Sequence, residues 1–265
     1  MADDDVDLSF LDRPEILGVI FYPRKSIYVK RSRPDAKNYF VEVENGVRIG
    51  CRFYLRGPDC ASMLYFHGNG EIVDDYDWCA HLFNDIGINL FVADYRGYGF
   101  SNGEPTITNM VTDSPKIFKR FKEIVTESNF DDTLFVMGRS LGSIPAIEVV
   151  FHYQEDVKGL IIESGSATNF LYFFEGLIPR NHPIWDDKNK LLNRAKVRSI
   201  SKPTLIIHAE YDSLVPLEEG EELYNSSSAK HKRFLMIPNA NHNDLMVAGE
   251  KAYFEALKEF VETHK

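Results

Sequence analysis

The stretch that decides the fold lies at residues 133–150 and reads TLFVMGRSLGSIPAIEVV. Its first five residues form an apolar, β-branched run typical of a buried strand, and an apolar helical pattern begins at Ser143. Between the two lies Gly138-Arg139-Ser140-Leu141-Gly142, a G-x-S-x-G pentapeptide. A tight turn at this point projects the serine hydroxyl above a sheet and turns the next N–H toward a developing oxyanion. We therefore predict that Ser140 is a nucleophile.

A second copy of the pentapeptide pattern occurs at Gly99-Phe100-Ser101-Asn102-Gly103. The pattern alone is a weak signal, so its context has to decide between the two copies. Ser101 lies several residues beyond the preceding strand pattern and is followed by Glu104-Pro105 instead of a helix. We interpret the second copy as a glycine-rich loop.

Short strand patterns alternate with helical patterns along most of the chain. Asn45-Gly46 is a turn pair that accepts positive φ and predicts a hairpin between the first two strands. Strands separated by crossover helices predict a mostly parallel, twisted sheet of about eight strands with helices on both faces. The predicted strands are 39–43, 47–54, 62–66, 88–93, 133–137, 159–162, 204–208 and 234–237. The predicted helices are 73–86, 109–127, 141–153, 217–226 and 245–263.

Two segments depart from this alternation. Residues 1–36 are mixed and punctuated by prolines, which predicts an N-terminal arm lying on an α/β domain of residues 37–265. Residues 164–202 form too long a connection between two strands and predict a short lid insertion. The large apolar side chains of the lid either line an acyl or aromatic pocket above the nucleophile or pack the lid onto the body. They are Phe170, Leu171, Tyr172, Phe173, Phe174, Leu177, Ile178 and Trp185.

A serine nucleophile of this kind needs a histidine as its base, and on this strand-turn-helix arrangement the histidine follows an acid in the chain. His242 lies in a loop after the last strand, and active sites collect in loops at the carboxyl ends of parallel strands. Other histidines fall within a helix, in a strand, in a basic run or at the C-terminus: His152, His208, His231 and His264. We therefore predict His242 as the base.

The acid is expected at the end of the strand 204–208. Asp212 is preferred because its short side chain, in a turn before Val215-Pro216, can fix the tautomer of the imidazole. Glu210 is the fallback, and Glu163 at the end of an earlier strand is a further alternative.

The loop His67-Gly68-Asn69-Gly70 follows the third strand. Its glycines allow a substrate to approach the backbone, and its place in the chain matches that of a second oxyanion donor. We predict the N–H groups of Asn69 and Leu141 as the donor pair, and a structural role for the His67 side chain.

The motifs together resemble the α/β-hydrolase superfamily over roughly residues 41–261, and within it the branch that includes serine aminopeptidase-like hydrolases and protein depalmitoylases. The resemblance rests on their order and spacing: residues 67–70, 94–101, 138–143, the Asp212 turn, Asn241-His242-Asn243-Asp244, and 193–208. It implies the α/β-hydrolase fold and a Ser-His-Asp triad acting through an acyl-enzyme. The N-terminal cysteine cluster of the depalmitoylases does not occur in this sequence, which implies no stable membrane anchor.

The expected reaction is hydrolysis of a carboxylic ester or thioester of a small to medium substrate, with pocket residues unassigned. Aminopeptidase-like hydrolysis of a peptide or amide is an alternative, and it needs a carboxylate pair such as Asp186-Asp187 to bind an α-ammonium group. A non-catalytic binding module is a second alternative. It is disfavoured because serine, acid and histidine are all present.

Composition excludes several partner classes. The 265 residues carry a formal net charge of −10, which argues against nucleic acid and anionic membranes as main partners. Three scattered cysteines suit a reducing compartment, and no secretory signal or membrane-spanning stretch is evident, so a cytoplasmic location is expected. No motif predicts a metal or other cofactor, and none predicts an oligomeric state.

Overall fold

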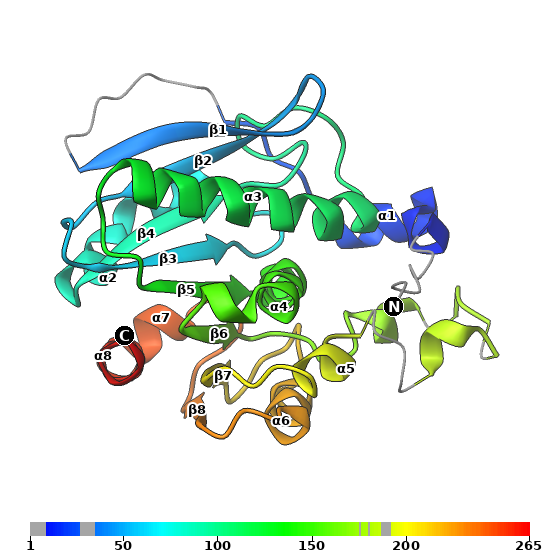
Figure 1. Cartoon of the computed structure of the whole chain (residues 1–265). Coiled ribbons are helices and arrows are strands. Elements are labelled where there is room, and N and C mark those ends of the chain that lie inside the picture. Colours follow the sequence, from blue (N-terminus) through cyan, green and yellow to red (C-terminus); the bar gives the residue numbers. More distant parts are fainter. Residues whose placement is uncertain (1–8, 27–34, 175, 180, 187–191) are drawn as a thin grey trace.

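An eight-stranded sheet forms the centre of the computed structural model, which describes residues 9–26, 35–174, 176–179, 181–186 and 192–265 (Figure 1). The strand order is β1-β2-β4-β3-β5-β6-β7-β8. β1 and β2 form the predicted hairpin, β2 pairs antiparallel with β4, and every later pair is parallel. The strands are β1 Ala36–Glu44, β2 Val47–Tyr54, β3 Ala61–Phe66, β4 Ile88–Ala93, β5 Leu134–Arg139, β6 Gly159–Glu163, β7 Thr204–Ala209 and β8 Lys232–Ile237. The predicted fold class is confirmed.

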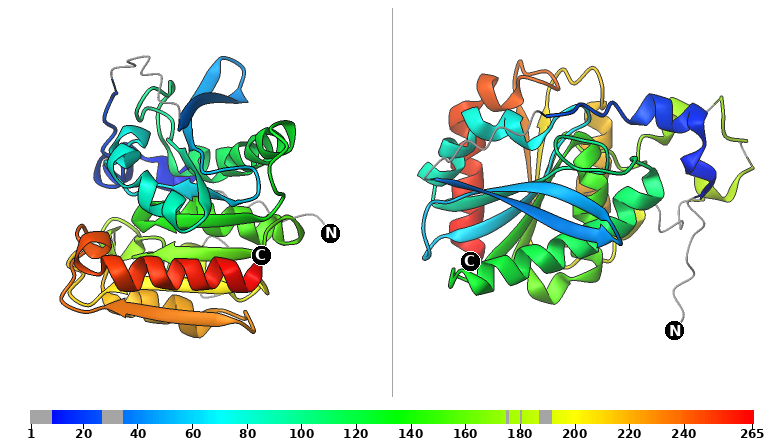
Figure 2. Two further views of the ribbon diagram at one scale, coloured as in Figure 1. Left: turned by 90° about the vertical axis from the view of Figure 1, so that its left-hand side faces the viewer. Right: turned by 90° about the horizontal axis from the view of Figure 1, so that it is seen from above.

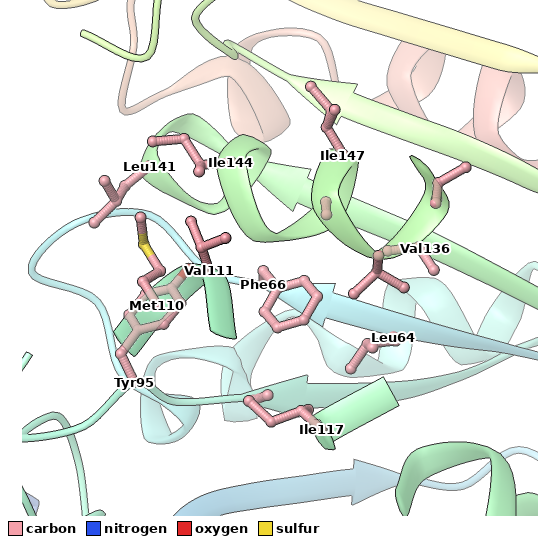
Figure 3. Packing of buried hydrophobic residues seen from close by; sticks show 14 of the residues in the cluster. Leu64, Phe66, Tyr95, Met110, Val111, Ile117, Val136, Leu141, Ile144 and Ile147 are labelled. Atoms are coloured by element: carbon pink, nitrogen blue, oxygen red, sulfur yellow. The ribbon is translucent and has the colours of Figure 1, made fainter. Parts of the chain in front are cut away.

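Helices cover both faces of the sheet because successive side chains of a strand point to opposite sides. In β3, Leu64 and Phe66 pack into one hydrophobic core, while Met63 and Tyr65 pack into the other. The first core lies under α3 Ile107–Glu127, α4 Ser143–His152 and α6 Leu217–Ser226, and Figure 3 shows Phe66 among the side chains of α3 and α4. The second core lies under α2 Ala80–Asp85 and α8 Glu250–His264, on the opposite side of the strands (Figure 2).

Several predicted helices have different ends or are divided. The predicted helix 73–86 is a 3₁₀ turn, Val73–Trp78, followed by α2. The predicted helix 245–263 is divided at Gly249 into α7 Leu245–Ala248 and α8. A Cβ at Gly249 would lie 2.5 Å from the Ile237 side chain, so the chain passes close to β8 where it bends. α3 begins two residues before the predicted start because the Thr106 hydroxyl accepts the N–H of Asn109 and caps it.

The N-terminal segment packs against residues of the predicted lid. α1, Pro14–Ile20, buries Ile16 and Ile20 in the first core. The rings of Phe10 and His182 stack with centroids 4.3 Å apart, and the Arg13 guanidinium donates to the carbonyl of Leu177. Both segments therefore lie side by side at one end of the molecule (Figures 1 and 2).

The lid segment contains two 3₁₀ turns, Leu171–Phe174 and Pro183–Trp185, and the short helix α5 Asn193–Val197. Parts of the predicted arm (1–8 and 27–34) and lid (175, 180 and 187–191) lie outside the described residues, and the division into arm, domain and lid stays a prediction. None of the helices in the described part of the chain is long and apolar enough to cross a bilayer.

Candidate active site

Ser140 lies on a sharp turn between β5 and α4. Its φ is +52°, in the left-handed region that costs a residue with a Cβ about 1–2 kcal/mol. A 3₁₀ turn over Ser140–Gly142 then leads into α4. Both flanking glycines are required by close backbone approach: a Cβ at Gly138 would lie 2.2 Å from the Gly142 carbonyl oxygen, and one at Gly142 would lie 2.1 Å from the Phe66 carbonyl oxygen. The turn therefore fits tightly between β3 and α4.

Gly142→Ala tests this packing. We expect the substitution to lower the free energy of unfolding by about 1–3 kcal/mol, since the added methyl group must push β3 and α4 apart. Gly18→Ala is the matched control, because a Cβ at Gly18, inside α1, meets nothing within 4 Å. That change should raise the stability by about 0.5–1 kcal/mol. Equal effects of the two substitutions on the denaturant midpoint would contradict the steric argument.

The structure brings the three predicted catalytic side chains together. The Nε2 atom of His242 lies 2.9 Å from the Ser140 Oγ, and its Nδ1 atom lies 2.9 and 2.8 Å from the two carboxylate oxygens of Asp212. Asp212 follows β7, and His242 follows β8. Ser140 and His242 are 7% and 4% exposed, and the Asp212 side chain is fully buried. Three loops at the carboxyl edge of the sheet thus form one water-poor cluster.

The surroundings of Asp212 determine its charge and the tautomer of His242. Burial opposes ionisation of Asp212, but hydrogen bonds from His242 and from the Val215 N–H outweigh it and lower the pKa of the carboxyl below its usual 3.8. An ionised carboxylate only accepts hydrogen bonds, so the Nδ1 atom of His242 carries its proton and the Nε2 lone pair faces Ser140. This is the tautomer that a base requires.

The alternative acids lie elsewhere. Glu210 accepts the N–H of Asn239 at 2.8 Å. Glu163 accepts from the Arg139 guanidinium at 3.0 Å and from the Tyr253 hydroxyl at 2.6 Å. Neither carboxylate is hydrogen-bonded to His242 among the described contacts. The second pentapeptide also lies apart: the Ser101 hydroxyl accepts the Gly50 N–H at 2.9 Å in a buried loop.

A second histidine contacts the acid, and the sequence patterns missed it. His208 is fully buried in β7, with Nε2 2.9 Å from the Val215 carbonyl oxygen and 3.6 Å from Asp212 Oδ2. Because the carbonyl is an acceptor, this nitrogen carries the proton. Burial lowers the pKa of His208, so the ring stays neutral beside the carboxylate.

Hydrogen bonds of the Asn69 and His67 side chains hold the loop that is predicted to carry the second oxyanion donor. The Asn69 side chain accepts hydrogen bonds from the Tyr22 N–H at 3.0 Å and the Tyr98 hydroxyl at 2.7 Å. The imidazole of His67 points into the protein, with Nε2 3.2 Å from the buried carboxylate of Asp94. Asn69 and Leu141 both line the cavity onto which Ser140 opens.

This cavity has a volume of about 270 Å³, and every side chain that lines it among the described residues is uncharged. Two lid side chains, Phe170 and Phe173, form part of its wall, whereas Leu171 and Phe174 are buried beneath. Some side chains of the predicted lid therefore line the cavity, and others pack against the body; whether the cavity takes an acyl or aromatic group stays a prediction. The cavity is lined by Val19, Ile20, Tyr22, Asn69, Ser140, Leu141, Phe170, Phe173, Leu214 and Val215.

Sequence reasoning did not assign the walls that the N-terminal segment and residues 214–215 provide. Leu214 and Val215 lie two and three residues after Asp212, so their apolar character was a usable signal. Val19 and Tyr22 carry no such signal because they are distant from every motif in the chain.

Arg139, the residue before the nucleophile, was also missed. Its guanidinium is almost fully buried and donates four hydrogen bonds: to Glu163 at 3.0 Å, to Glu71 at 2.7 Å, to the His242 carbonyl at 2.8 Å and to the Asn243 side chain at 3.2 Å. A charged residue between a buried strand and a buried turn is unusual enough to have served as a signal.

Other chemistry would need a metal site or, for an aminopeptidase-like reaction, a carboxylate pair. Within the described ranges, no group of three or more histidine, cysteine, aspartate or glutamate side chains is arranged to hold a metal ion. Of the acidic pair weighed for binding an ammonium group, Asp187 lies outside the described residues. Asp186 is not among the side chains that line the cavity.

Comparison with known proteins agrees with the fold. A family model described as serine aminopeptidase, S33, matches residues 57–172. Human alpha/beta hydrolase domain-containing protein 17B is 26% identical over 242 residues, covering 88% of this chain and 78% of the human protein. Mouse protein 17C is 24% identical, covering 88% of this chain and 70% of its own.

Solved structures show the same fold. The esterase Pf2001 of Pyrococcus furiosus superposes with a TM-score of 0.71 at 18% identity, covering 92% of this chain and 98% of the esterase. Est1E of Butyrivibrio proteoclasticus, solved with ferulic acid bound, has a TM-score of 0.68 at 19% identity, covering 85% of this chain and 98% of Est1E.

The mostly parallel sheet, the sharp turn after β5 and the loops at the carboxyl edge of the sheet are features of the α/β-hydrolase fold. The chain has the α/β-hydrolase fold, and it is similar to the serine aminopeptidase S33 family and to the alpha/beta hydrolase domain-containing proteins 17, which supports an enzyme of the hydrolase class. The resemblance drawn from the motifs is confirmed.

Proposed function

We propose that this protein is a serine hydrolase that cleaves a carboxylic ester or thioester through Ser140, His242 and Asp212. The observation that carries the proposal is the 2.9 Å separation of His242 Nε2 from Ser140 Oγ, with Asp212 on the other ring nitrogen. A nucleophile, a base and an orienting acid in this order of contact suit acyl transfer.

In the proposed reaction, Ser140 Oγ attacks the substrate carbonyl while its proton passes to His242 Nε2. The N–H groups of Asn69 and Leu141 stabilise the oxyanion, and Asp212 stabilises the imidazolium. His242 then donates the proton to the leaving alcohol or thiol, which leaves an acyl group on Ser140. Water, deprotonated by His242, hydrolyses this acyl-enzyme and restores the serine.

The cavity supports an apolar acyl group. Its described lining is uncharged, so burying a hydrocarbon there is favourable and burying an unpaired charge is costly. An α-ammonium group would need a carboxylate partner, and none of the described cavity side chains supplies one. These features favour an ester or thioester over the aminopeptidase-like alternative.

An acyl-chain series tests both the reaction and the pocket. We expect turnover of p-nitrophenyl esters and of acyl thioesters, with kcat/KM rising up to about fourfold per added methylene, since burying one CH₂ contributes about 0.8 kcal/mol. Phe173→Ala should flatten this rise because Phe173, although 51% exposed, forms part of the cavity wall.

Phe40→Ala is the matched control, since Phe40 is 44% exposed on β1 and does not line the cavity. The assignment of the pocket is wrong if both variants keep the wild-type slope. Faster cleavage of an aminoacyl anilide than of any ester would instead support the peptidase alternative.

A further inference from the structure

The guanidinium of Arg139 connects three segments that meet at the candidate active site. It directly precedes Ser140 at the end of β5, and its Nη2 atom donates to the main-chain carbonyl of His242 at 2.8 Å. Its Nη1 atom donates to Glu71 at 2.7 Å, and the other oxygen of Glu71 accepts the N–H of Gly68 at 2.7 Å. Gly68 precedes Asn69 in the oxyanion loop. One side chain thus contacts the histidine loop directly and the oxyanion loop through Glu71.

We propose that Arg139 is the positioning residue that holds the histidine loop and the oxyanion loop at fixed distances from the nucleophile. This inference rests on the proposed function. Arg139 is joined to Ser140 by a single peptide bond, so any movement of the two loops relative to Arg139 is also a movement relative to the serine. The guanidinium touches no reacting atom and acts through the groups it holds.

The surroundings of Arg139 keep its planar fork in one orientation. Nε donates to Glu163 at the end of β6, and Tyr253 of α8 holds the other oxygen of that carboxylate at 2.6 Å. Nη2 also contacts the Asn243 side chain. Arginine presents its donors in a rigid plane, whereas a lysine ammonium has one nitrogen and cannot reach the same set of acceptors. The geometry therefore requires arginine and not simply a positive charge.

A second, smaller cavity of about 100 Å³ gives access to this cluster from the surface. Arg139, Glu71 and Glu163 line it, and Trp78 and Val247, which are 57% and 63% exposed, lie at its rim. Truncation of Arg139 would enlarge the cavity and leave two carboxylates facing it. A small planar cation could enter and replace the lost group.

Chemical rescue tests the inference. We expect Arg139→Ala to lower kcat for a p-nitrophenyl ester by about 10²-fold, the size of effect that a misplacement of about 1 Å causes, with KM nearly unchanged. Guanidinium ion at about 50 mM, far below the molar concentrations that unfold proteins, should raise kcat of this variant on the order of tenfold. Sodium chloride at equal ionic strength should not.

Arg96→Ala is the matched control. Arg96 has the same low exposed fraction as Arg139 and is also paired with two carboxylates, Asp113 and Glu44, but none of its described hydrogen bonds reaches either loop. Per folded molecule, its kcat should stay near wild type and show no response to guanidinium. Equal losses of kcat in both arginine variants, or no rescue of Arg139→Ala by guanidinium, would overturn the inference.

Arg139→Lys covers the case in which the alanine variant does not fold. It keeps the charge and should still lose kcat without a matching change in KM; wild-type kcat in the lysine variant would also overturn the inference. Wild-type enzyme and Ser140→Ala are assayed alongside. If the wild type hydrolyses neither esters nor thioesters, the proposed function fails, whereas an active wild type with unimpaired Arg139 variants means that only the positioning role is wrong.

Discussion

Replacement of Ser140 by alanine should lower kcat/KM for a p-nitrophenyl ester by about 10⁴- to 10⁶-fold and abolish labelling by a fluorophosphonate. The expected loss is large because the hydroxyl is the only group that forms the acyl-enzyme bond in the proposed mechanism. Without it, His242 can only activate water from the wrong position. Ester assays and mass spectrometry of the labelled peptide measure the two effects.

Ser101→Ala provides the matched control, because Ser101 has the same G-x-S-x-G context but contacts the Gly50 N–H instead of a histidine. Loss of that acceptor leaves a buried N–H unpaired and should cost about 1–3 kcal/mol of stability, with activity per folded molecule retained. Fluorophosphonate attached to Ser101, or full turnover by Ser140→Ala, would disprove the choice between the two pentapeptides.

Asp212→Asn should lower kcat by about 10⁴-fold with little change in the fold. The amide has a similar shape, but its NH₂ group is a donor and can stabilise the wrong tautomer of His242, in which Nε2 bears the proton and cannot accept one from Ser140. Glu210→Gln is the control, because Glu210 is hydrogen-bonded to Asn239 in another part of the loop. If Glu210→Gln were the more damaging change, Glu210 and not Asp212 would be the acid.

The stability of the wild type and that of Asp212→Asn should also depend differently on pH. The pKa of Asp212 is lowered in the folded state, so its ionised form stabilises the fold. This contribution is fully present above the ordinary aspartate pKa and is lost as the pH falls through the folded-state value. The difference in unfolding free energy between wild type and Asp212→Asn should therefore shrink below about pH 4. A difference that grows on acidification would contradict the assigned shift.

Most of the fold was predictable because it depends on local periodicity. Short strand patterns of four to eight residues marked all eight strands, and Asn45-Gly46 marked the hairpin, since both signals reflect backbone geometry within a few residues. Helix ends were less predictable. The break at Gly249 depends on the contact with Ile237, a strand residue whose proximity the local pattern does not encode.

The residues of the candidate site were likewise predictable from the sequence in part only. Ser140, Asp212 and His242 could be chosen because each follows a strand of a parallel sheet, and the carboxyl ends of such strands meet at one edge. The role of Glu163 was open in the sequence. In the structure, its carboxylate is bonded to Arg139 and Tyr253, which are brought to it by neighbouring strand β5 and by helix α8.

The sequence by itself determined the sheet, the strained turn at Ser140 and the order of the three side chains, because these follow from backbone preferences and from the connection of strands through helices. Only the tertiary structure decided what surrounds them. Tyr22 of the N-terminal segment and Phe173 of the predicted lid line the same cavity as Ser140, and Arg139 joins the histidine loop to the oxyanion loop. These contacts join residues far apart in the chain, and their geometry depends on how whole elements pack.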